Sequence, residues 1–117
     1  MKPEQIERFI KTQKKQLQLD DWKFYLEIAL SDVDYLGCIN FAPGRKEAIL
    51  TIRQTLPETD TIAGVVRHEL LHAIMRPISL LVDQWKAMLK EEDAKLYETQ
   101  MDEAEDQVVA HLTHILP

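Results

Sequence analysis

The chain has 117 residues, of which 45% are hydrophobic and 29% charged, and a formal net charge of −6 at neutral pH. These values are typical of one soluble globular domain spanning residues 1–117 and exclude a disordered chain. Nucleic acid is excluded as the main partner, because phosphate binding requires clustered lysine and arginine. The single cysteine excludes a disulfide framework and a cysteine-based zinc site.

The sequence also argues against a membrane partner. The most apolar helical segment, residues 73–82, is interrupted by Arg76 and Pro77, so it is too short for a membrane span. The first residues are polar and lack the apolar core of a signal peptide. We therefore expect a cytoplasmic protein.

The N-terminal half predicts one helix followed by three strands. Apolar residues recur at helical spacing over residues 3–18, which indicates an amphipathic helix. Residues 22–29 alternate between apolar and polar, the pattern of a strand with one buried face. Two further strands are predicted at residues 36–41 and 48–52. The loop between them contains Gly44 and is short, so these two strands are expected to pair antiparallel.

The C-terminal half predicts helices. Thr59 or Asp60 can cap a helix that carries apolar residues at helical spacing, and Pro77 is expected to end it. A second helix is expected from about residue 79 to the mid-90s, and a last one from near Glu98. The predicted fold is therefore α+β: a small antiparallel or mixed three-stranded sheet, backed by the N-terminal helix, a central helix and C-terminal helices.

The central helix carries the sequence His68-Glu69-Leu70-Leu71-His72. Residues four apart lie on one helical face, so His68 and His72 can bind the same ion. Glu69 points to the side of that ion, where it can act as general base on a zinc-activated water. Catalytic zinc has three protein ligands, so we expect one Zn²⁺ with a third ligand from elsewhere. Alternatively, the spacing is a coincidence on a core helix.

The acidic C-terminal segment offers several candidates for the third ligand. Glu105 lies on the apolar stripe of the last helix, where an acid is costly unless it is paired or bound to metal. Glu98 is the alternative ligand. Asp102 could accept the second ring N–H of a ligating histidine. Glu103 and Asp106 point toward the polar side of the helix and are expected to be solvated.

This arrangement resembles the gluzincin metallopeptidases in their smallest form, the minigluzincins, and the compact phage and prophage metallopeptidase-like proteins. The resemblance implies a zincin-like fold. It offers two patterns for the ligand: Glu98-x-x-x-Asp102 matches the gluzincins, whereas Glu105 ahead of Val108-Val109 matches the phage-type proteins. It also implies that the last strand before the zinc helix borders the cleft as an exposed edge and pairs with extended substrate. The substrate-binding residues would then be Ala48, Ile49, Leu50, Thr51 and Ile52.

The sequence thus favours an enzyme, a zinc-dependent metallopeptidase that hydrolyses peptide bonds of a peptide or protein substrate, with Glu69 as general base. A catalytically silent, zinc-stabilised binding or regulatory module of phage or prophage type is the alternative. A metal-free helical interaction protein is the third hypothesis.

Overall fold

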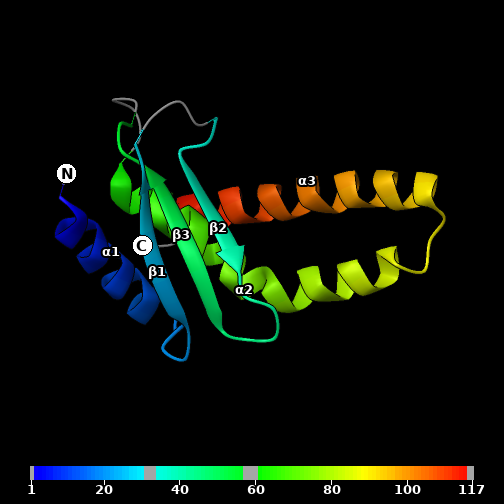
Figure 1. Cartoon of the computed structure of the whole chain (residues 1–117), viewed down its shortest axis with the longest axis horizontal. Helices are drawn as coiled ribbons and strands as arrows, with labels where there is room; N and C mark the ends of the chain where they lie inside the picture. The colour runs from blue at the N-terminus through cyan, green and yellow to red at the C-terminus, as the bar shows by residue number, and fades with distance from the viewer. Residues whose placement is uncertain (1, 31–33, 57–60, 116–117) are drawn as a thin grey trace. The chain divides into compact units, whose positions relative to one another are not determined.

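The computed structural model describes residues 2–30, 34–56 and 61–115. It confirms the predicted α+β class, with a mixed three-stranded sheet and three helices (Figure 1). The chain forms two compact units, Met1–Leu70 and Leu71–Pro117, and their boundary falls within one helix. In chain order the elements are α1 (Pro3–Gln16), β1 (Lys23–Ala29), β2 (Gly37–Phe41), β3 (Glu47–Arg53), α2 (Ile62–Lys86) and α3 (Glu91–Ile115).

The sheet has the strand order β1-β3-β2. β2 and β3 pair antiparallel, as their short connection predicts, and Gly44 adopts the positive φ of 69° that the loop requires. β1 pairs with β3 in parallel. The starts of β1 and β3 are tied by an ion pair between Asp21 and Lys46, which holds the pKa of Asp21 below its ordinary value of 3.8.

The expectation that residues 48–52 form an exposed edge strand is wrong. β3 is the central strand, and its Leu50 lies opposite Leu26 of β1 and Ile39 of β2. Its main chain therefore pairs on both sides and has no free edge for a substrate peptide. Ala48, Leu50 and Ile52 are all buried, which explains why β3 occupies the centre of the sheet. The outer strands are β1 and β2.

The strand pattern predicted for β1 is confirmed, because its apolar side chains are half-buried on one face and its polar ones are exposed on the other. Trp22, just before β1, is buried. Its ring stacks on Phe24, with centroids 5.7 Å apart, and meets the ring of Phe41 edge-on at 5.6 Å. These aromatic contacts join the start of β1 to the end of β2.

Hydrogen bonds tie the first turns of α2 to α1 within the first unit. Arg67 donates from Nε to Gln13 Oε1 over 2.7 Å and from a terminal nitrogen to Gln16 Oε1 over 3.0 Å. The helix begins after Thr61, whose hydroxyl accepts a hydrogen bond from the Gly64 amide over 3.0 Å. The predicted caps, Thr59 and Asp60, lie outside the described residues.

The expectation that Pro77 ends the central helix is wrong, because α2 continues to Lys86. Proline costs a helix one backbone hydrogen bond, here to the Ala73 carbonyl. The Ser79 hydroxyl donates a hydrogen bond to the Arg76 carbonyl over 3.0 Å. A side chain thus adds a hydrogen bond to the backbone in the turn that contains Pro77. The helix predicted from about residue 79 to the mid-90s is therefore divided between two helices. Its first part belongs to α2, and the rest forms one helix, α3, with the predicted last helix, beginning at Glu91.

Within the second unit, α3 runs back alongside the C-terminal part of α2 (Figure 1). Near the turn between them, Lys86 Nζ lies 3.0 Å from Glu98 Oε2. The first turn of α3 carries three acids, which the positive end of the helix dipole favours. Among the residues that the structure describes, no helix has the length and apolar character needed to cross a membrane.

Candidate metal centre and active site

The His68–His72 motif lies inside α2, as predicted, in the most buried stretch of that helix. Val66, Leu70 and Leu71 have no exposed surface. His68 and Glu69 belong to the first compact unit and His72 to the second, while α2 runs through both. The helix backbone thus presents the two histidines one turn apart on a common face.

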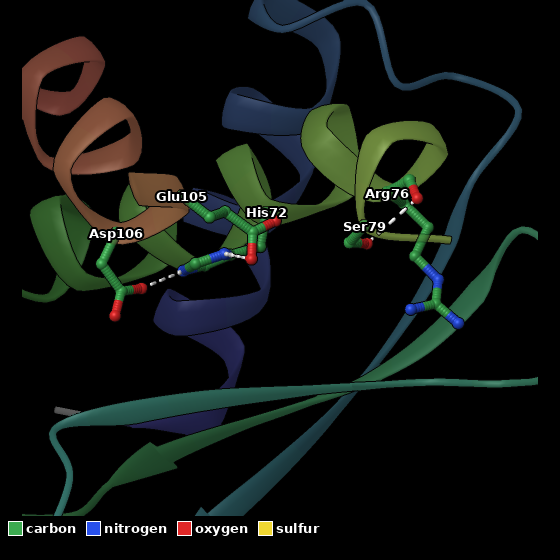
Figure 2. Close-up of polar contacts among 5 residues, drawn as sticks. All are labelled: His72, Arg76, Ser79, Glu105 and Asp106. Carbon is green, nitrogen blue, oxygen red and sulfur yellow. Dashed lines mark hydrogen bonds and ion pairs between the residues drawn. The ribbon is translucent and has the colours of Figure 1, made fainter. Parts of the chain in front are cut away.

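Two acids of α3 flank the imidazole ring of His72 (Figure 2). Glu105 Oε2 lies 3.7 Å from Nδ1 of the ring, and Asp106 Oδ1 lies 3.7 Å from Nε2. All three residues are in the second unit. The prediction that Glu105 lies on the partly buried face of α3 is confirmed, since its side chain is 23% exposed.

Asp106 is a residue that the sequence did not single out. Its side chain is 68% exposed, as expected for a solvated acid, yet its carboxylate also reaches the ring of His72. The only feature of the sequence that points to this contact is that Asp106 directly follows Glu105. Two adjacent residues of one helix can lie on either side of a side chain from a neighbouring helix. Asp106 therefore joins Glu105 as a candidate partner of His72.

The environment of Glu105 opposes its ionised form. Burial raises the pKa of Glu105 above its ordinary value of 4.5, and the neighbouring His72 partly counters this rise. Asp102 and Glu105 both line a hollow of about 140 Å³ between α2 and α3, whose other walls are mainly apolar. Burial, together with the charge of Glu98, likewise raises the pKa of Asp102 above 3.8. An ion pair or a bound cation would relieve the cost of holding these acids ionised.

Glu98 occupies a different part of the second unit. Its carboxylate is engaged by Lys86 and is half exposed. It precedes Glu105 by two helical turns, or roughly 10 Å along the axis of α3. The structure therefore places Glu105, and not Glu98, beside His72.

The imidazole of His72 and the carboxylate of Glu105 are both groups that bind zinc. Zinc binds imidazole nitrogen and carboxylate oxygen at about 2.0–2.2 Å, so two ligand atoms around a tetrahedral ion lie roughly 3.4 Å apart. The separation of 3.7 Å between His72 Nδ1 and Glu105 Oε2 is close to that value. Across the described ranges, no three histidine, cysteine or acidic side chains already converge on one point as metal ligands. The fit to zinc therefore rests on this His72–Glu105 pair and on the spacing of the motif.

Glu69 lies against the start of β2, within the first unit. Its side chain is buried, with 8% of its surface exposed. A Cβ atom at Gly37 would lie 3.1 Å from Glu69 Cγ, 3.4 Å from Glu69 Oε1 and 2.8 Å from Val65 Cγ1. Only glycine leaves room for this approach, so the outer strand β2 and the carboxylate of Glu69 are neighbours. No pattern in the sequence indicates this role for Gly37.

Comparisons with protein-family models, with curated proteins and with solved structures give no match to this chain.

The contact between β2 and Glu69 gives a direct prediction for Gly37→Ala. The added methyl group would overlap Val65 Cγ1, so we expect the free energy of unfolding to fall by about 1–3 kcal/mol. Urea denaturation of the two proteins measures this difference. In a Val65→Ala background, the same substitution should cost much less, because the overlapping methyl group is gone. An equal cost in both backgrounds would contradict the contact.

Proposed function

We propose that this protein is a zinc-dependent metallopeptidase of zincin-like fold, similar to the minigluzincins. The observation that carries the proposal is the buried His68-Glu69-x-x-His72 motif of α2, with Glu105 of α3 placed beside His72. An imidazole–carboxylate set of this kind is the ligand chemistry of catalytic zinc. The substrate in this proposal is a peptide or protein.

In this proposal, His68, His72 and Glu105 hold one zinc ion. The bound ion would lower the pKa of water to about 7 and polarise the scissile carbonyl. Glu105 is available as ligand only when it is ionised, which burial opposes and a neighbouring cation favours. Asp106, on the other ring nitrogen of His72, would orient the imidazole by accepting its N–H. Asp102 remains a further candidate for such an orienting bond.

Glu69 is the general base of the proposed reaction. Its carboxylate accepts a proton from the attacking water and passes it to the leaving amine. Glu69 lies next to Gly37, the first residue of β2, and β2 is an outer strand of the sheet. An extended peptide that pairs with this outer strand would therefore pass close to Glu69. In this way β2 takes over the substrate-pairing role that the sequence suggested for residues 48–52.

The proposal is tested by the metal dependence of peptide hydrolysis. Purified protein should contain about one zinc per chain, as catalytic zinc sites hold a single ion of this kind. Incubation with a diverse peptide mixture, read by mass spectrometry, should show cleavage. Removal of the metal with a chelator should abolish cleavage, and added Zn²⁺ should restore it. Cleavage that persists in the metal-free protein would overturn the proposal.

A second function is favoured by the burial of Glu69. A general base must reach both water and substrate, and only 8% of this residue is exposed. A zinc-stabilised binding or regulatory module would keep the same ligands and need no such access. It predicts bound zinc, a thermal midpoint that falls on chelation, and no cleavage of any peptide in the mixture.

A further inference from the structure

The C-terminal part of α2 exposes a row of large apolar side chains. Ile74, Ile78, Leu81 and Trp85 are exposed over 42%, 57%, 53% and 61% of their surfaces. Met88, just beyond the helix end, continues the row and is 87% exposed. We call these five residues the α2 stripe. Trp85 is therefore a surface residue of α2.

The spacing of the α2 stripe is that of a helix–helix seam. Its members follow one another at intervals of four, three, four and three residues, which is the heptad pattern that packs one helix against another. The hollow between α2 and α3 is lined mainly by a neighbouring row of α2, which includes Met75 and Val82, and of the stripe only Ile78 also reaches it. Most of the α2 stripe is therefore left over after the helical hairpin of the second unit has formed.

The size of the α2 stripe matches a protein interface. Its five side chains expose roughly 600 Å², the upper end of what a soluble monomer leaves as one apolar patch. Two such stripes facing each other would remove at most about 1,200 Å² from water, the boundary between weak and standard-sized complexes. A second copy of this chain thus supplies the area of a weak complex.

Charge also favours a second copy. The α2 residues beside the stripe, namely Met75, Pro77, Val82 and Gln84, carry no charge, so two stripes meet without like-charge repulsion. An anionic membrane surface is a poor alternative. The net charge of −6 and the acids of α3 in the same unit would oppose its approach.

We propose that two copies of this chain dimerise through the α2 stripe, with their α2 helices antiparallel. In this register Ile78 packs against the partner's Leu81, and Ile74 packs against the partner's Trp85. The two outer layers then pair the large Trp85 ring with the smaller Ile74, the two central layers pair Ile78 with Leu81, and a two-fold axis relates the two halves. A parallel pairing would instead place the two Trp85 rings in one layer. This dimer does not depend on the proposed peptidase function.

Sedimentation equilibrium of the full chain tests the interface. We expect a dimer with a dissociation constant in the micromolar range. Leu81→Lys should raise this constant by at least about tenfold, because it puts a charge into the centre of the seam. Leu80→Lys, on the same helix but outside the stripe, should leave it within about twofold. Circular dichroism checks that both variants, at half-exposed positions, remain folded.

Cysteine cross-linking in a Cys38→Ser background tests the orientation. The double variant Ile74→Cys/Trp85→Cys should form covalent dimers on mild oxidation, whereas Trp85→Cys alone should not. In the antiparallel register the two copies of position 85 lie about 16 Å apart along the axis, beyond the reach of a disulfide. Covalent dimers of Trp85→Cys alone would overturn the antiparallel pairing. Wild-type protein that is still monomeric at about 100 µM would overturn the dimer. Monomeric protein that co-floats with phosphatidylcholine vesicles would also overturn it.

Discussion

Glu69→Gln is expected to abolish peptide hydrolysis while the protein keeps its zinc. Glutamine has nearly the same shape as glutamate, so it fits the buried space beside Gly37. It cannot accept the proton of the attacking water. We expect the cleavage rate to fall by about 10²–10⁴-fold, the usual contribution of a positioned general base.

The two readouts of this experiment are independent. Zinc content, measured by elemental analysis, should stay at about one ion per chain, because Glu69 is not a ligand in the proposed site. Glu103→Gln, an exposed acid of α3, is the matched control and should change neither quantity. Cleavage by Glu69→Gln at the wild-type rate would contradict the assigned role, whatever its zinc content.

Glu105→Ala is expected to lose zinc, whereas Glu98→Ala is expected to retain it. Glu105 lies 3.7 Å from His72, while Glu98 is held by Lys86 near the far end of α3. Removal of one of three protein ligands should weaken zinc binding by more than about 100-fold, since loss of an orienting residue alone costs about 10–100-fold. Competition with a chromophoric chelator measures the affinity without reference to any activity.

Asp106→Ala distinguishes the two acids that flank His72. If Asp106 orients the imidazole, its removal should weaken zinc binding by about 10–100-fold, between the effects of the Glu98 and Glu105 variants. A larger loss in Asp106→Ala than in Glu105→Ala would exchange the roles of the two acids. Loss of zinc in Glu98→Ala alone would contradict the ligand set proposed here.

Local patterns in the sequence were enough to predict several features. The alternation in residues 22–29 predicts β1, and the spacing of the motif places His68 and His72 on one helical face. The position of Glu105 on an apolar stripe predicts its partial burial. Each of these depends on the geometry of a single helix or strand, which repeats at a fixed period whatever the rest of the chain does.

The tertiary structure decided which elements are neighbours. β3 could not be recognised as the central strand, because strand order depends on which edges pair, and the sequence encodes no edge directly. α2 continues through Pro77, and the Ser79 hydroxyl donates to the Arg76 carbonyl at this turn, a local bond that the proline pattern alone does not predict. Asp106 beside His72 and Gly37 beside Glu69 are contacts between residues more than thirty positions apart. The sequence by itself therefore determined the motif and the elements that carry it, and only the tertiary structure decided which acid and which strand lie beside it, because such contacts have no local periodicity.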